Sequence, residues 1–138
     1  MAELDPIERE ILDKTFTFPQ GIPGFPTLHR FVFSQEEGHR PFTVMRSVED
    51  VNVAFVVIEA FYLKPDYVMD VDDIELEPIG SPGPLDCVIL FIIRLESGKP
   101  FRIHANLRAP LVLHKEKKLG SQIVLHDARY SEQETFEF

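Results

Sequence analysis

The chain has 138 residues, enough for one domain with its own hydrophobic core, and 44% of its residues are hydrophobic. Its formal net charge is −9 and no apolar run is long enough to span a bilayer, which argues against binding to nucleic acid or membranes. With Cys87 as its single cysteine and no apolar core of a signal peptide near the N-terminus, the chain is expected to be cytoplasmic.

The charge is unevenly distributed along the chain. Residues 1–86 carry 6 basic and 17 acidic side chains, a net charge of −11, whereas residues 87–138 carry a net charge of +2. An acidic half either keeps the protein soluble or attracts a basic partner, and the charge alone leaves both readings open.

The first quarter of the chain predicts a short acidic helix and then a strand. Asp5 can cap a helix over residues 5–13, and Pro6 suits the first helical position. A strand is expected at residues 15–18. Pro23-Gly24 predicts a type II turn, because Pro presets the second position and Gly accepts a positive φ at the third.

The middle of the chain predicts further strands, at residues 31–34, 42–47 and 53–59. Residues 64–73 are ambiguous and could hold a helical turn. Residues 74–79 alternate apolar and acidic side chains, which predicts a half-buried strand that Pro78 confines to an edge or an end.

The second half is the more hydrophobic. Residues 88–95 predict a central strand, followed by a strand at 101–106 and a hairpin of 111–114 and 122–126 around a loop at 115–120. Asn106 and Pro110 interrupt this β region, which indicates a bulge or bend where the Asn side chain can bond the nearby backbone.

These elements predict a single all-β domain over residues 1–138. We expect about eight short strands and minimal helix in a compact, barrel-like arrangement, because no βαβ alternation is present. Two terminal regions are acidic, an N-terminal segment at residues 1–14 and a C-terminal tail at residues 131–138.

Three groups of side chains suggest chemistry. Parity along the predicted strands puts His104, His114 and His126 on one solvent-facing side, which is compatible with a three-histidine zinc site, but exposed strand histidines are the better interpretation because parity supplies no convergence on one ion. The acidic run from residue 70 to residue 77 lacks the spacing of a calcium loop and is better read as a solvated face that suits a basic partner. Lys115, Lys117 and Lys118 could touch RNA, but a solvated turn is the simpler reading.

Catalysis has no support in the sequence. No serine lies in a nucleophile elbow, and no glycine-rich phosphate loop is present. Cys87 stands beside the apolar run of residues 88–95, where a thiol is normally packed and inert. We therefore expect neither an enzyme nor a cofactor.

Four stretches, in order, resemble one known family, the flagellar assembly factor FliW. Residues 18–25 (FPQGIPGF) resemble its F-P-x-G-[LI]-P-G-F signature, and residues 105–113 (ANLRAPLVL) resemble its A-N-L-x-A-P-[IL]-V-[IV] stretch. Residues 120–125 (GSQIVL) with Tyr130 are similar to its G-x-Q-[VI]-[IV]-L…Y ending. Pro41-Phe42, Ala54–Val57 and Pro65–Tyr67 follow the family in order and spacing.

The resemblance implies a non-enzymatic, cytoplasmic protein that works as a partner switch. It implies binding to CsrA, an RNA-binding regulator that represses translation of flagellin mRNA, and binding to flagellin itself, in the manner of a chaperone. Under this hypothesis the partner-binding residues are acidic: Asp70, Asp72, Asp73, Glu75 and Glu77. The family-motif positions are expected to be structural: Gly21, Pro23, Gly24, Phe25, Asn106, Pro110, Gly120 and Gln122. The alternative is a ligand- or metal-binding β-barrel.

Overall fold

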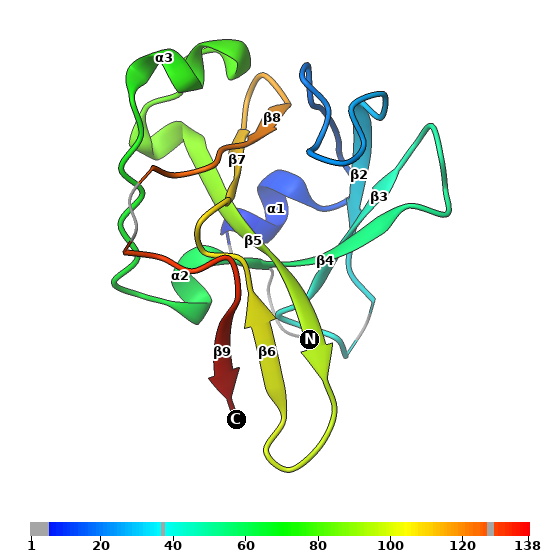
Figure 1. Ribbon diagram of the computed structural model, residues 1–138. Coiled ribbons are helices and arrows are strands. Elements are labelled where there is room, and N and C mark those ends of the chain that lie inside the picture. Colours follow the sequence, from blue (N-terminus) through cyan, green and yellow to red (C-terminus); the bar gives the residue numbers. More distant parts are fainter. Residues whose placement is uncertain (1–5, 37, 127–128) are drawn as a thin grey trace.

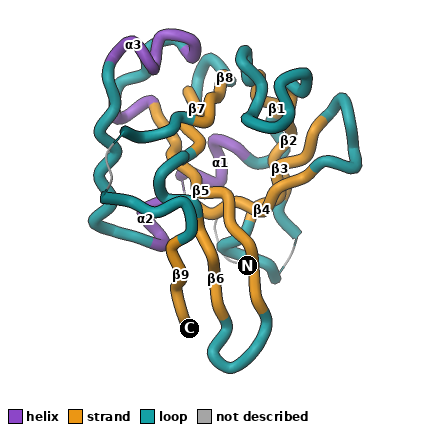
Figure 2. Tube along the Cα trace, viewed as in Figure 1, coloured by secondary structure: helices purple, strands orange, loops and turns teal. Residues whose placement is uncertain are grey.

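The computed structural model describes residues 6–36, 38–126 and 129–138, and its regular secondary structure is mostly strand, joined by loops and turns (Figure 2). The strands are β1 (Thr15–Thr17), β2 (Arg30–Ser34), β3 (Thr43–Ser47), β4 (Ala54–Glu59), β5 (Cys87–Glu96), β6 (Arg102–Ala105), β7 (Leu111–His114), β8 (Leu119–Gln122) and β9 (Glu134–Glu137). The helices are short: α1 (Pro6–Ile11), α2 (Ala60–Leu63), α3 (Asp73–Leu76) and the 3-10 turns η1 (Glu77–Ile79) and η2 (Pro84–Asp86).

Seven of the strands close into a ring. The order is β4-β3-β2-β1-β8-β7-β5, and the ring is completed where β5 pairs back to β4. The pairings within it are antiparallel except that of β1 with β8, whose one register pair joins Thr17 to Leu119. β6 and β9 extend the sheet from the second half of β5 (Figure 1). The predicted all-β class is confirmed.

The inner face of the ring is packed with aromatic and aliphatic side chains. Phe16 meets Phe33 edge to face at 5.4 Å, and Phe18 meets Phe31 in the same way at 5.3 Å. Side chains alternate between the two faces of a strand, so Phe16 of β1, Phe18 directly after it, and Phe31 and Phe33 of β2 all point inward and are buried. The cluster also holds Ile11, which docks the short helix α1.

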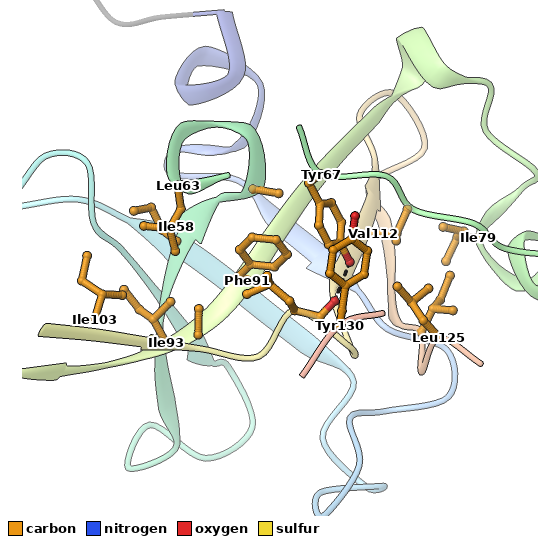
Figure 3. Packing of buried hydrophobic residues seen from close by; sticks show 14 residues of the cluster. Ile58, Leu63, Tyr67, Ile79, Phe91, Ile93, Ile103, Val112, Leu125 and Tyr130 are labelled. Carbon is orange, nitrogen blue, oxygen red and sulfur yellow. Dashed lines mark hydrogen bonds between the residues drawn. The ribbon is translucent and has the colours of Figure 1, made fainter. Parts of the chain in front are cut away.

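A second cluster covers the outside of the ring. Figure 3 shows Phe91 of β5 and Val112 of β7 packed with Tyr67 and Tyr130, two residues from connecting segments. The Tyr67 hydroxyl donates to the Leu107 carbonyl at 2.6 Å, and the Val68 amide donates to the Tyr130 hydroxyl at 2.9 Å. These bonds hold the segment after α2 against the sheet, and burial raises the pKa of Tyr67 well above its usual range.

Several predicted elements are correct. The helix expected at residues 5–13 is present as α1, although Asp5 lies outside the described residues. The expected central strand is β5, which pairs with β4, β6 and β7. At the predicted type II turn Gly24 has a φ of +88°, and the Phe25 amide donates to the Ile22 carbonyl. No helix among the described residues is long and apolar enough to cross a bilayer.

The strand predicted at residues 74–79 is wrong, since this segment forms α3 and η1. A half-buried strand would hide Ile74 and Leu76 on one face, but Ile74 is 69% exposed while Ile79 is fully buried. Asp73 and Glu75 occupy the first turn of α3, where the positive end of the helix dipole stabilises carboxylates. Gly80, with a φ of +87°, ends η1.

One other prediction, at the C-terminal end, is wrong in detail. The final hairpin pairs β7 with residues 119–122 rather than 122–126, because a tight turn with Lys118 at a φ of +56° brings His114 opposite Leu119. The acidic tail at residues 131–138 contains a strand, β9, which pairs with β6. The structure therefore has nine strands among the described residues, where about eight were expected.

Candidate functional site

The five predicted partner-binding carboxylates lie together on one surface segment. The acidic segment, defined as Asp70, Asp72, Asp73, Glu75 and Glu77, runs through the connection before α3, through α3 and into η1. Four of these side chains are exposed, and Glu75 is half-buried. The segment is therefore available to a positively charged partner along its whole length.

Part of the acidic segment surrounds a shallow depression. Asp70, Asp72 and Glu75 line a volume of about 330 Å³ together with His126. The His126 Nε2 atom lies 3.4 Å from Glu75 Oε1, and the imidazole is 86% exposed. The three carboxylates give this depression a negative potential, which favours binding of a lysine or arginine side chain.

The glycine-rich stretch after β1 folds into a compact loop, here called the motif loop (residues 19–26). The Gly21 amide donates to the Phe18 carbonyl at 2.9 Å, and Gly21 itself has a φ of +67°. Pro23 is exposed, and Phe25 packs edge to face on Phe55 with the ring centroids 5.9 Å apart. The loop thus has a defined shape at the same end of the molecule as α3 (Figure 1).

The remaining family-motif positions are held by close contacts. Asn106 Oδ1 accepts hydrogen bonds from the Arg108 and Ala109 amides, and Gln122 Nε2 donates to the Ala109 carbonyl at 3.1 Å. Pro110 is buried and its carbonyl accepts from the Ile123 amide. A Cβ atom at Gly120 would lie 2.6 Å from Phe18 Cζ, so this position has no room for a side chain.

The motif loop and the acidic segment flank the same stretch of chain. A depression of about 250 Å³ lies between the motif loop and the end of β8, lined by Gln20 to Gly24, Pro26, Ser121 and Gln122. A second one of about 260 Å³ continues past Gln20 to α3 and η1, and its lining is Gln20, Ile74, Glu75, Pro78 and residues 121–124. We call the second the edge groove.

The edge groove contains residues that the sequence patterns did not single out. Ile74 is 69% exposed and Val124 is 51% exposed, although both are large and apolar. Exposed apolar side chains beside carboxylates are typical of a protein-binding surface. The sequence gives only an indirect indication of this surface, namely apolar residues that alternate with acidic ones. Whether the Ile74 side chain is exposed depends on how α3 packs, and the sequence pattern does not reveal that.

The expectation that three histidines share one exposed face is wrong. The His104 side chain is only 10% exposed and bonds Glu96, whereas His114 is buried in β7 and accepts a bond from the Lys117 amide. Of these three histidines, His126 alone is open to solvent. Within the part of the chain that the structure describes, no three His, Cys, Asp or Glu side chains are grouped so as to hold a metal.

The predicted lysine cluster is split by local contacts. Lys117 Nζ lies 3.4 Å from the Gly80 carbonyl, and Lys118 Nζ donates to the Lys115 carbonyl and lies over the Phe16 ring. Cys87 is half-buried at the start of β5, and burial raises the pKa of its thiol, which lowers its nucleophilicity at neutral pH.

A polar bridge ties β9 to the sheet. His104 Nε2 donates to Glu96 Oε1 at 2.8 Å, and with a neutral ring His104 Nδ1 accepts from the Thr135 hydroxyl at 3.0 Å. The hydrogen bond from His104, helped by nearby Arg102, holds the pKa of Glu96 below its usual range.

Replacing His104 by alanine should therefore raise the pKa of Glu96 toward its ordinary value, as measured by NMR titration of the carboxyl carbon. A depressed pKa contributes stability above the unfolded pKa of the group, and the contribution disappears as the pH falls through the folded pKa. Thr135→Val is the matched control, since it removes the other bond of the ring and should leave the Glu96 pKa nearly unchanged. An unaltered Glu96 pKa in His104→Ala would contradict the assignment.

Comparison with known proteins decides the family. The FliW protein family model matches residues 4–136 of the 138. The chain belongs to the FliW family of flagellar assembly factors. It is 36% identical to the flagellar assembly factor FliW of Treponema denticola over 112 residues, which cover 80% of this chain and 74% of that protein.

Other FliW proteins align over more of the chain. FliW of Caldicellulosiruptor bescii is 36% identical over 130 residues, covering 94% of this chain and 81% of the relative. A crystal structure of the flagellar assembly factor FliW matches with a TM-score of 0.80 at 32% identity, covering 96% of this chain and 88% of that one. The family resemblance read from the motifs is confirmed.

Proposed function

We propose that this FliW-family chain is a non-enzymatic, cytoplasmic antagonist of CsrA that also binds flagellin. The observation that carries the proposal is the acidic segment, five neighbouring carboxylates that the fold leaves open to solvent beside exposed apolar residues. A basic RNA-binding protein is the kind of partner that such a surface attracts.

Antagonism follows from electrostatics once the two proteins are docked. Residues 1–86 carry a net charge of −11, so the complex presents added negative charge next to the RNA-binding surface of CsrA. The added negative charge then repels incoming RNA although the RNA-binding site of CsrA stays unoccupied. It does so because attraction between cationic side chains and phosphates supplies much of the affinity of a protein for RNA. Flagellin that accumulates unsecreted captures the FliW-family protein and frees CsrA to repress.

The experiment is calorimetric titration with CsrA from the same organism at two salt concentrations. The wild-type protein should bind saturably, and the binding should weaken as salt screens the charges. Exchanging the acidic segment's five carboxylates for the corresponding amides should weaken binding about tenfold, which corresponds to about 1.4 kcal/mol, and should flatten the salt dependence.

The matched control neutralises five exposed acids elsewhere, so that both variants carry the same net charge. Suitable positions are Glu36, Asp66, Glu116, Glu132 and Glu134. This control should bind CsrA nearly as the wild type does. If both variants lose the same affinity for CsrA, only the overall charge of the protein matters. If the acidic-segment variant binds CsrA as tightly as the wild type does, the acidic segment is not part of the interface. Absence of any binding to CsrA would overturn the proposed function.

A further inference from the structure

In the described part of the structure, β8 and the residues that follow it are paired mainly along one side. Residues 119–122 pair with β7, and beyond them the Ile123 amide donates to the Pro110 carbonyl and the Leu125 amide to the Arg108 carbonyl. On the other side β1 reaches only Leu119, because the chain leaves the sheet after Thr17 and turns into the motif loop. Among the described residues, the stretch 121–124 is therefore a sheet edge with no strand beside it.

The antiparallel pattern determines which backbone groups point outward. Alternate residues of a strand direct their N–H and C=O groups to opposite sides, and Ile123 and Leu125 direct theirs toward residues 108–110. Gln122 and Val124 must then direct their backbone groups the other way. Within the part of the chain that the structure describes, no backbone partner is found for either of them on that side.

This open edge forms the floor of the edge groove. Residues 121–124 line it together with Gln20 on one wall and Ile74, Glu75 and Pro78 on the other. In Figure 1, β8 lies between α3 and the loop that follows β1, as the lining residues require. The groove thus combines the outward backbone groups of Gln122 and Val124, for which the described residues supply no partner, with the exposed apolar side chains of Ile74 and Val124.

The charge around the groove indicates what can occupy it. Glu75 belongs both to the edge groove and to the depression lined by Asp70 and Asp72, so the two lie next to each other. A second copy of this chain would bring another acidic segment against the first, and its net charge of −9 opposes that approach. An extended segment with a lysine or arginine meets no such repulsion.

We propose that the edge groove binds an extended segment of a partner protein by strand addition along Gln122–Val124. One apolar side chain of the segment packs against Ile74 and Val124, and a lysine or arginine further along enters the depression formed by Asp70, Asp72 and Glu75. Backbone pairing supplies the affinity and the alternate side chains supply the specificity, as in other cases of strand addition. The inference rests on the proposed function in one respect, that the segment belongs to CsrA, the basic partner that the acidic segment attracts.

The test begins with overlapping twelve-residue peptides that cover CsrA and flagellin of the same organism, assayed for binding to the wild-type protein. The tightest peptide is then titrated against two variants of Val124. Val124→Pro removes the outward N–H at an edge position that tolerates proline, and Val124→Ala keeps that N–H while trimming the side chain. We expect at least tenfold weaker binding for Val124→Pro and less than threefold for Val124→Ala.

A second measurement leaves the protein unaltered. Methylating the peptide's backbone nitrogens one at a time should abolish binding at alternate residues and be tolerated between them, which is the signature of a paired strand. This measurement keeps the inference testable even if Val124→Pro does not fold, which thermal unfolding would reveal.

Equal affinities of the two variants, or binding indifferent to methylation, would overturn the inference. So would the absence of any CsrA peptide that binds when full-length CsrA still binds, or binding by flagellin peptides alone, and in both cases the proposed function stands. If neither full-length CsrA nor full-length flagellin binds the wild-type protein, both this inference and the proposed function are overturned.

Discussion

Asn106→Ala is expected to lower the free energy of unfolding by about 2–3 kcal/mol, because two half-buried backbone donors lose their acceptor. Asn106 Oδ1 accepts from the Arg108 amide at 3.1 Å and from the Ala109 amide at 3.0 Å. The turn that these bonds hold places Leu107, 1% exposed, in the second hydrophobic cluster. The midpoint of urea unfolding measures the effect, with an unchanged slope indicating that the unfolded state is unaltered.

Asn106→Asp is the matched control for this prediction. Aspartate keeps an oxygen at the same place and accepts the same two hydrogen bonds, so its stability should stay within about 1 kcal/mol of the wild type. A loss in Asn106→Asp as large as that in Asn106→Ala would show that the amide nitrogen, and not the acceptor oxygen, stabilises the turn.

Gly21→Ala is expected to cost about 2–4 kcal/mol, through two separate effects. Gly21 has a φ of +67°, a conformation that an L-residue adopts only with strain. Its new Cβ would also lie 2.7 Å from the Pro26 carbonyl oxygen and 2.9 Å from Pro26 Cα, so the backbone of the motif loop must move. Chemical unfolding measures the loss of stability.

Gly24→Ala separates the two effects. Gly24 has a φ of +88°, but a Cβ there would meet nothing within 4 Å. Only the backbone strain applies, so the expected cost is about 1 kcal/mol. Equal costs at both glycines would mean that the close approach of Pro26 has no energetic consequence.

Sequence patterns predicted the parts of the fold that depend on local chemistry. The hydrophobic run at residues 88–95 lies within β5, the strand with three neighbours. Likewise the pair Pro23-Gly24 became a turn with a positive φ at Gly24. Each of these depends on a few adjacent residues, whose preferences hold in almost any tertiary context.

Patterns failed where two structures suit the same residues. The alternation in residues 74–79 satisfies a strand period, but Asp72 precedes a helix and Gly80 follows one, which are boundary signals of the kind found at helix ends. The histidines show a related limit of sequence patterns, which concerns exposure to solvent. Parity places His104, His114 and His126 on faces, but it does not say which faces the other strands cover.

The sequence by itself determined the all-β class, the excess of acid in the first 86 residues and the FliW motifs, because each is a property of composition or of adjacent residues. Only the tertiary structure decided that Glu134–Glu137 pairs with β6 and that β1 leaves the sheet after Thr17. Strand pairing joins residues far apart along the chain, and its choice depends on the packing of all the other strands. The open edge at residues 121–124 is a product of that choice.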